Sequence, residues 1–64
     1  MVYKFNCSDY NSKIEFEPSI EDNVMLITMT DKNTREKISV EVDSDDIKDL
    51  VELFENILNK MKNE

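Results

Sequence analysis

The side chains with the most capacity for chemistry in this 64-residue chain are its acids, which number 15 against eight lysines and arginines. Residues 41–55 hold seven acids and one lysine, so this segment carries a net charge of −6 out of −7 for the whole chain. Asp45, Asp49 and Glu52 are spaced by four and three residues, which places them on one face of a helix. Asp46 and Glu55 flank that face.

An anionic helix face of this kind suits a basic surface on another protein, including a protein that binds nucleic acid. The sequence therefore predicts a partner-binding site formed by Asp45, Asp49, Glu52 and Glu55. The alternative is a solvated face whose acids cap the helix, favour its positive N-terminal end and keep the protein soluble. Acids in the first turn fit that alternative, whereas Asp49, Glu52 and Glu55 lie beyond the capping turn.

The composition argues against catalysis and against a metal or cofactor site. The chain has no histidine, the usual general base and metal ligand, and no glycine for a phosphate-binding loop. Residues 43–46 are similar to the start of a calcium-binding loop, but a hydrophobic helix begins where further ligands would be needed. Acid–base catalysis by paired carboxylates needs one of them in an apolar pocket, and every acid here falls in a turn or at a polar position. We therefore expect no enzymatic activity, no cofactor and no metal.

Cysteine usage and hydropathy indicate a reducing compartment. Cys7 is the only cysteine, whereas a secreted domain of this size usually carries several disulfides. No signal-peptide pattern follows Met1, and the longest apolar run, residues 24–27, is far shorter than the ~20 residues of a membrane helix. We expect a cytoplasmic protein with no membrane insertion. Direct nucleic-acid binding is not expected, because the bases are scattered along the sequence and the net charge repels phosphate.

Two hydrophobic periods divide the chain into strands and a helix. Alternating apolar and polar residues predict four strands, near residues 2–7, 12–17, 24–30 and 35–42. Asparagine and aspartate, which tolerate left-handed backbone, fall between them, and Pro18 is expected to end the second strand. A helical period predicts a helix near residues 44–61, capped by Asp43 or Ser44. Its apolar stripe comprises Ile47, Leu50, Val51, Phe54, Ile57, Leu58 and Met61.

These elements predict a single α+β domain over residues 1–64. The expected architecture is a four-stranded antiparallel meander with the C-terminal amphipathic helix packed across one face (ββββα), since each can cover the other's apolar side. An even-numbered loop before the fourth strand places Ile38 and Val40 on the helix side, whereas a three-residue loop with a bulge at Asn33 would invert that strand. Ile20 is expected to plug the edge of the core. The predicted sheet side of the core is Tyr3, Phe5, Ile14, Phe16, Met25, Ile27, Met29, Ile38, Val40 and Val42.

The other side of the sheet, with the tip of the first hairpin, is a second candidate interface. Val24 and Leu26 make an apolar spot with a polar rim. Tyr10 lies at the predicted hairpin tip, where an aromatic ring can anchor a partner or fold back over the sheet edge. The sequence leaves open a homodimer through this side or through an exposed edge strand.

Two classes of function follow. The first is a small acidic protein-interaction module that binds a basic surface of a protein partner as an inhibitor or regulator. In size, acidity and composition the chain is similar to the small inhibitors that phages and mobile elements carry, including anti-CRISPR and other anti-defence proteins; this likeness is one of overall profile, and no motif carries it. The alternative is a non-catalytic structural or accessory subunit that dimerises or docks through the outer sheet face. Rising salt weakens an acidic contact but not an apolar one.

Overall fold

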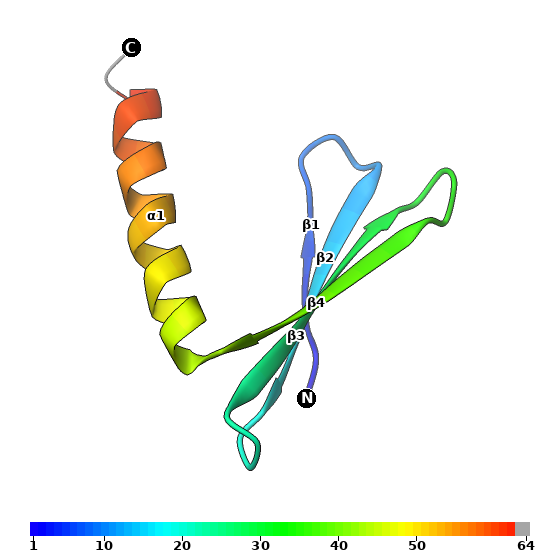
Figure 1. Cartoon of the computed structure of the whole chain (residues 1–64). Coiled ribbons are helices and arrows are strands. Elements are labelled where there is room, and N and C mark those ends of the chain that lie inside the picture. The colour runs from blue at the N-terminus through cyan, green and yellow to red at the C-terminus, as the bar shows by residue number, and fades with distance from the viewer. Residues whose placement is uncertain (63–64) are drawn as a thin grey trace.

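A computed structural model describes residues 1–62 and shows a ββββα fold (Figure 1). Its elements are β1 (Tyr3–Asn6), β2 (Ser12–Ser19), β3 (Val24–Asp31), β4 (Lys37–Asp43) and α1 (Ser44–Lys62). The strands form one antiparallel sheet in the order β1-β2-β3-β4, so the predicted meander is confirmed. Predicted and observed boundaries differ most at the end of β2 and at the start of β4.

The strand β2 runs past Pro18, so the prediction that Pro18 ends it is wrong. Pro18 pairs with Met25 of β3. On its other side β2 pairs with β1 only over residues 13–16, which makes β2 an edge strand at Pro18. A proline is tolerated there because its missing N–H does not break a ladder of hydrogen bonds.

Asparagine and aspartate shape turns in this chain without glycine. Asn23 has a φ of 57°, in the left-handed region that asparagine tolerates. The Asp31 carboxylate accepts a hydrogen bond of 2.9 Å from the N–H of Asn33. Left-handed backbone also occurs at Tyr10 (φ 61°) and Arg35 (φ 64°), residue types that give no such signal in the sequence.

The register gives the sheet one apolar side, called the inner face here. Phe16 pairs with Ile27, and Ile27 pairs in turn with Val40. Paired residues of neighbouring antiparallel strands project from the same side. The inner face carries every residue predicted for the sheet side of the core: Tyr3, Phe5, Ile14, Phe16, Met25, Ile27, Met29, Ile38, Val40 and Val42.

The connection between β3 and β4 has the predicted even-numbered form. Asp31 donates its N–H to the carbonyl of Glu36 at 2.9 Å, and Thr30 pairs with Lys37. Odd positions of β3 therefore face even positions of β4. The inverted alternative with a bulge at Asn33 does not occur.

The helix α1 does not lie across the inner face. It leaves the end of β4 and diverges from the sheet, so the two form a V (Figure 1). Its main contacts with the sheet are with β4, the strand that leads into it. None of its described residues is buried, and Phe54, at the middle of the apolar stripe, is 64% exposed. The apolar stripe of α1 is turned towards the inner face, as predicted. In the single chain, however, the helix does not pack against that face.

The junction between β4 and α1 explains this angle. The helix begins at Ser44 directly after Asp43, without a linker. Asp43 and Asp46 cap it reciprocally: Asp43 Oδ1 accepts from the N–H of Asp46 at 2.9 Å, and Asp46 Oδ2 accepts from the N–H of Asp43 at 3.2 Å. Asn23 Nδ2 donates to Ser44 Oγ at 2.9 Å, which ties the helix start to the β2–β3 loop. These bonds hold the direction in which the helix departs.

Burial within the single chain is correspondingly low. Among residues 1–62, Ile27 is the only buried apolar residue, with 8% of its surface exposed. Ile38, on the same face, is 71% exposed. Ile20 is 87% exposed, so the prediction that it plugs the core edge is wrong. The β2–β3 loop that carries it extends beyond the end of the sheet, where no other element covers it (Figure 1).

Candidate functional site

The predicted partner-binding residues Asp45, Asp49, Glu52 and Glu55, called the acidic strip, all lie exposed on α1. Over these residues a helix rises about 1.5 Å per residue, so the strip is about 15 Å long. Its centre lies on the side of α1 opposite to the apolar stripe, because the two sets are out of phase in the helical period. The acids therefore point away from the sheet.

Two parts of this acidic segment have different surroundings. Asp46 is engaged in the N-terminal cap, so the structural role that the sequence offered for the first turn is present. Asp49, Glu52 and Glu55 make no side-chain hydrogen bond or ion pair with another residue of 1–62. The salt bridge found in that range joins Lys13 and Glu15 on the sheet, with 3.5 Å between Nζ and Oε1.

The space between α1 and the inner face is an apolar groove of about 440 Å³. Every residue that lines it is apolar. The sheet contributes Phe16, Met25, Ile27 and Val40 among others, and the helix contributes Ile47, Leu50, Val51 and Phe54. The sequence identified these residues as core, but in the single chain they line an open groove.

The apolar side of α1 is wider than the stripe predicted from the sequence. Leu53 is 50% exposed and lies beside Leu50 and Ile57, three and four residues away along the helix. Sequence reasoning missed it because it falls at the margin of the stripe. It adds to the apolar surface that the chain leaves uncovered.

The outer face, which is the side of the sheet turned away from α1, is polar with a small apolar spot. Val24 and Leu26 lie on it, as predicted. Leu26 pairs with Glu17 on one side and Glu41 on the other, and it is 38% exposed. Acidic neighbours and partial burial leave little continuous apolar area there.

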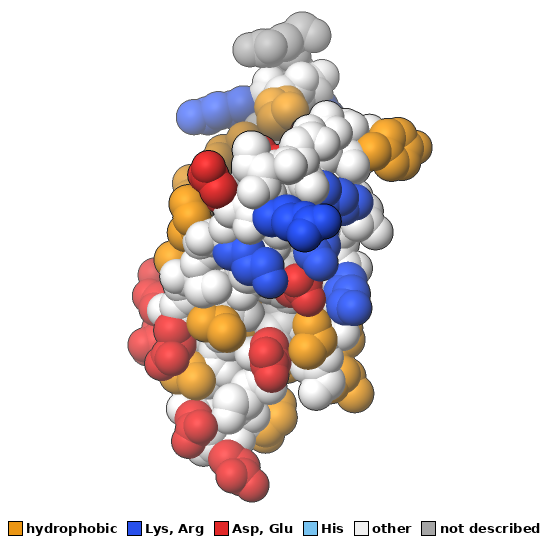
Figure 2. All heavy atoms as spheres, turned by 90° about the vertical axis from the view of Figure 1, so that its right-hand side faces the viewer, with side chains coloured by type: hydrophobic (Ala, Val, Ile, Leu, Met, Phe, Trp, Pro, Cys, Tyr) orange, Lys and Arg blue, Asp and Glu red, His pale blue; other side chains and the backbone are white. Residues whose placement is uncertain are grey.

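The register also gathers bases that are dispersed in the sequence. Lys13 and Lys37 flank Thr30 in the neighbouring strands, and Lys32 Nζ donates to Asn6 Oδ1 at 3.0 Å. Figure 2 shows several lysine and arginine side chains grouped near the middle of this view, with acids and hydrophobic side chains interspersed in its lower part. The description of the bases as scattered is therefore wrong for the folded chain. Hairpin pairing joins positions far apart in sequence, and spacing alone does not reveal the group.

Tyr10 occupies the turn between β1 and β2 and is 81% exposed. Its N–H donates to the carbonyl of Cys7 at 3.0 Å. The next residue, Asn11, donates its N–H to Asp9 Oδ1 at 2.9 Å. Of the two orientations that the sequence left open, the ring takes the solvent-exposed one.

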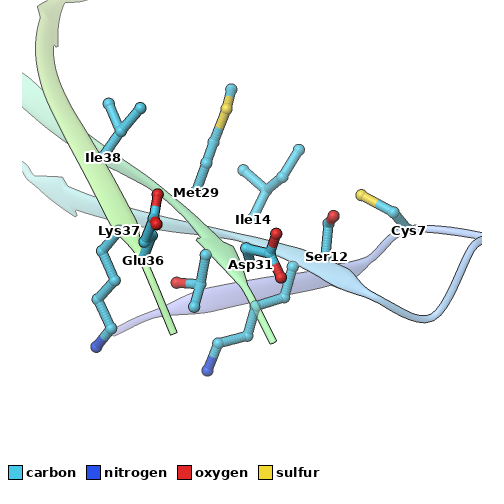
Figure 3. Close-up of a pocket in the computed structure, with 10 residues that line it drawn as sticks. Cys7, Ser12, Ile14, Met29, Asp31, Glu36, Lys37 and Ile38 are labelled. Atoms are coloured by element: carbon cyan, nitrogen blue, oxygen red, sulfur yellow. The ribbon is translucent and has the colours of Figure 1, made fainter. Parts of the chain in front are cut away.

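A second hollow, of about 490 Å³, lies at the sheet end formed by the β1–β2 and β3–β4 loops. Figure 3 shows Ile14, Met29 and Ile38 projecting from one side of the sheet and Lys37 from the other. Cys7, which is half-buried, lines the same hollow. Within residues 1–62 no group of three or more His, Cys, Asp or Glu side chains could hold a metal ion.

None of the described helical residues forms a segment long and apolar enough to cross a membrane. Comparison of the chain with protein-family models, curated proteins and solved structures found no match. The candidate binding surfaces of the chain are therefore the acidic strip, the apolar groove and the outer face.

Proposed function

We propose that this protein is a protein-interaction module that binds a basic surface of a protein partner through the acidic strip. The supporting observation is the placement of Asp49, Glu52 and Glu55 on a helix that diverges from its own sheet, exposed and unpaired within residues 1–62. By occupying the basic surface, the module acts as an inhibitor or regulator of that partner. An anti-defence inhibitor of the phage type is one form of this function, supported by size, acidity and composition alone.

The charge distribution favours this mode of binding. The net charge of −7 is concentrated in and around the first half of α1. Such a field accelerates encounter with a basic surface and discriminates against acidic ones. A protein that binds nucleic acid carries a suitable basic surface, and the strip would compete for it. Nucleic acid itself is disfavoured as a direct ligand because phosphate is repelled overall.

The test is the triple charge reversal Asp49→Lys, Glu52→Lys and Glu55→Lys. Proteins captured from lysate by the parent chain are identified, purified and measured individually for association and dissociation rates. The reversal removes no packing, since all three side chains are exposed, and folding should survive. Association with the purified partner should slow by more than tenfold. The parent's affinity should fall as salt rises, because exposed charges are screened.

The matched control reverses three exposed acids outside α1: Glu17→Lys, Glu21→Lys and Glu36→Lys. Both triple variants change the net charge by +6, from −7 to −1. A contribution from overall charge affects them equally, whereas a contact through the strip affects the helix variant far more. If both variants bind with the parent's rate and salt dependence, the acidic strip is a solvated face and the proposal is wrong.

A further inference from the structure

The most unusual property of this fold is that its apolar surfaces are both well formed and uncovered. Of the ten apolar residues predicted for the inner face, Ile27 alone is buried, four are half-buried and five are exposed. The stripe of α1 presents a matching set, with no buried member among its described residues. A contiguous exposed apolar surface of this extent marks an interaction site in a stable protein.

The size of the uncovered surface can be estimated from the accessible area. The chain exposes 5693 Å², whereas a compact monomer of 7.6 kDa exposes about 4,300 Å². The radius of gyration is 13.6 Å, against about 11 Å for a compact chain of this length. The excess is about 1,400 Å² per chain, or about 2,800 Å² for two chains, which lies in the range of obligate homodimer interfaces.

The β4–α1 junction disfavours covering this surface with the chain's own helix. No residue separates β4 from α1, and the reciprocal Asp43–Asp46 cap holds the first turn. The bond from Asn23 to Ser44 holds the same turn against the β2–β3 loop. Closing the V would break these bonds or reorient them. A short connection of this kind favours exchange of the helix between two copies over folding back within one.

We propose that the occupant of the groove is a second copy of this chain, in a symmetric dimer whose helices are exchanged. Each α1 packs its stripe on the inner face of the other copy, so that Phe54 of one copy lies against Ile27 of the partner copy. A symmetric dimer covers the apolar stripe and the inner face of both copies at once, because each chain carries a helix and a face that fit each other. Within the described part of the chain no charged residue lines the groove, so the groove does not select an acidic or a basic partner. The acidic strips remain on the outside of the dimer.

The test measures the mass of the full chain in solution and identifies which copy covers the groove. Sedimentation of the parent should give twice the chain mass of 7.6 kDa. In a sample that mixes isotope-labelled and unlabelled chains, isotope-filtered NMR should show contacts from the Phe54 ring to Ile27 methyl groups between copies. A monomer at all accessible concentrations overturns the proposal. Contacts found only within one chain overturn it as well.

A linker variant tests the exchange itself. Six flexible Gly/Ser residues inserted between Asp43 and Ser44 let α1 reach its own sheet, at an effective concentration in the millimolar range. The variant should sediment as a monomer with the parent's circular dichroism. If it remains as dimeric as the parent, the two copies associate through another surface and the exchange is wrong.

Substitutions supply matched controls for the location of the interface. Phe54→Lys places a charge in the apolar groove and should reduce dimer affinity by at least a hundredfold. Leu26→Lys makes the same kind of change on the outer face and should leave the mass unchanged. The parent dimer should persist or tighten as salt rises, because apolar burial strengthens while repulsion between the two acidic copies is screened. A Phe54→Lys variant that keeps the parent's mass overturns the proposal. If this variant does not fold, the mixed-label contacts of the parent still decide the question.

Discussion

The two faces of the sheet are built from the same strands but differ in the interactions that stabilise their side chains. Two pairs of side chains on the outer face interact within the sheet: Thr28 and Ser39 share a hydrogen bond of 3.0 Å between neighbouring strands, and Lys13 forms an ion pair with Glu15 along β2. The apolar side chains of the inner face have matching neighbours, but within residues 1–62 only the splayed helix lies above them. Pairing within the sheet can complete a polar face. An apolar face is completed only when another layer covers it.

In the proposed exchanged dimer, the interface lies on the inner face and not on the outer face that the sequence offered. A homodimer through Val24 and Leu26 was one alternative, since the outer face of a small meander is bare when the helix covers the inner one. The structure reverses that situation, because it is the inner face that stands open. The apolar area there is much larger than the spot around Leu26. Variants that separate the two faces therefore test the architecture most directly.

The largest effect is expected from Phe54→Ala. In the single chain this side chain is 64% exposed, and truncating it would change stability by less than about 1 kcal/mol. In the exchanged dimer it is buried in the groove, and the loss should be about 3–5 kcal/mol per chain. Chemical denaturation at fixed protein concentration distinguishes the two values. The concentration must be held constant, because the stability of a dimer depends on it.

Ile20→Ala is the control for that measurement. Ile20 is also highly exposed in the single chain, but it lies in the β2–β3 loop outside the apolar groove. Its truncation should change the free energy of unfolding by no more than about 0.5 kcal/mol. Equal small effects of both substitutions would show that the groove stays open in solution.

Much of the fold was predictable because local periodicity determines it. Tyr3 and Phe5 alternate with polar residues, and the helical stripe from Ile47 to Met61 repeats at three and four residues. Register followed from hairpin parity, since an even-numbered loop brings Ile38 opposite Met29. These features depend on residues close together in sequence. The residues of both sheet faces could therefore be assigned from the sequence up to the choice between an even-numbered and a three-residue loop before β4, which the structure decides.

The departure of the helix was not predictable in the same way. It depends on the local bonds between Asp43 and Asp46 and on the bond from Asn23 to Ser44, which joins the start of α1 to a loop 21 residues earlier. The pattern of apolar and polar residues indicates that the stripe of α1 is covered. It does not indicate whether the same chain or a second copy covers it. The grouping of Lys13 with Lys37 around Thr30 was hidden for a related reason, because strand pairing creates it. The acidic strip was located correctly on the surface, while its function remains a prediction.

A smaller effect is expected at the junction between β4 and α1. Asp43→Ala removes the carboxylate that accepts from the N–H of Asp46 at 2.9 Å. Loss of an N-cap side chain should destabilise the protein by about 1 kcal/mol. It should also loosen the angle of α1, which hydrogen exchange of the first-turn amides would report as faster exchange. Unchanged exchange at Asp46 would show that the cap does not hold the junction in solution.

Smaller again is the expected effect of Thr28→Ala on the outer face. The substitution removes the hydroxyl pair with Ser39, and cross-strand pairs of this type contribute about 0.2–1 kcal/mol. The dimer mass should not change, because the outer face is not part of the groove. A loss of several kcal/mol, as predicted for Phe54→Ala, would mean that Thr28 is covered by another layer.

The smallest effect should come from Leu26→Lys, which tests the outer face as an interface. Leu26 lies between Glu17 and Glu41, so a lysine there gains two oppositely charged cross-strand neighbours. That gain offsets the lost apolar contact, and the free energy of unfolding should stay within about 0.5 kcal/mol of the parent. Leu26→Glu loses the same contact but faces two like charges. It should therefore be less stable than the lysine variant by about 0.5–1 kcal/mol, a difference that high salt reduces. Both variants should sediment with the parent's mass. If the lysine variant instead separates the copies while keeping its circular dichroism, the outer face is the dimer interface, and the open inner face needs a different occupant.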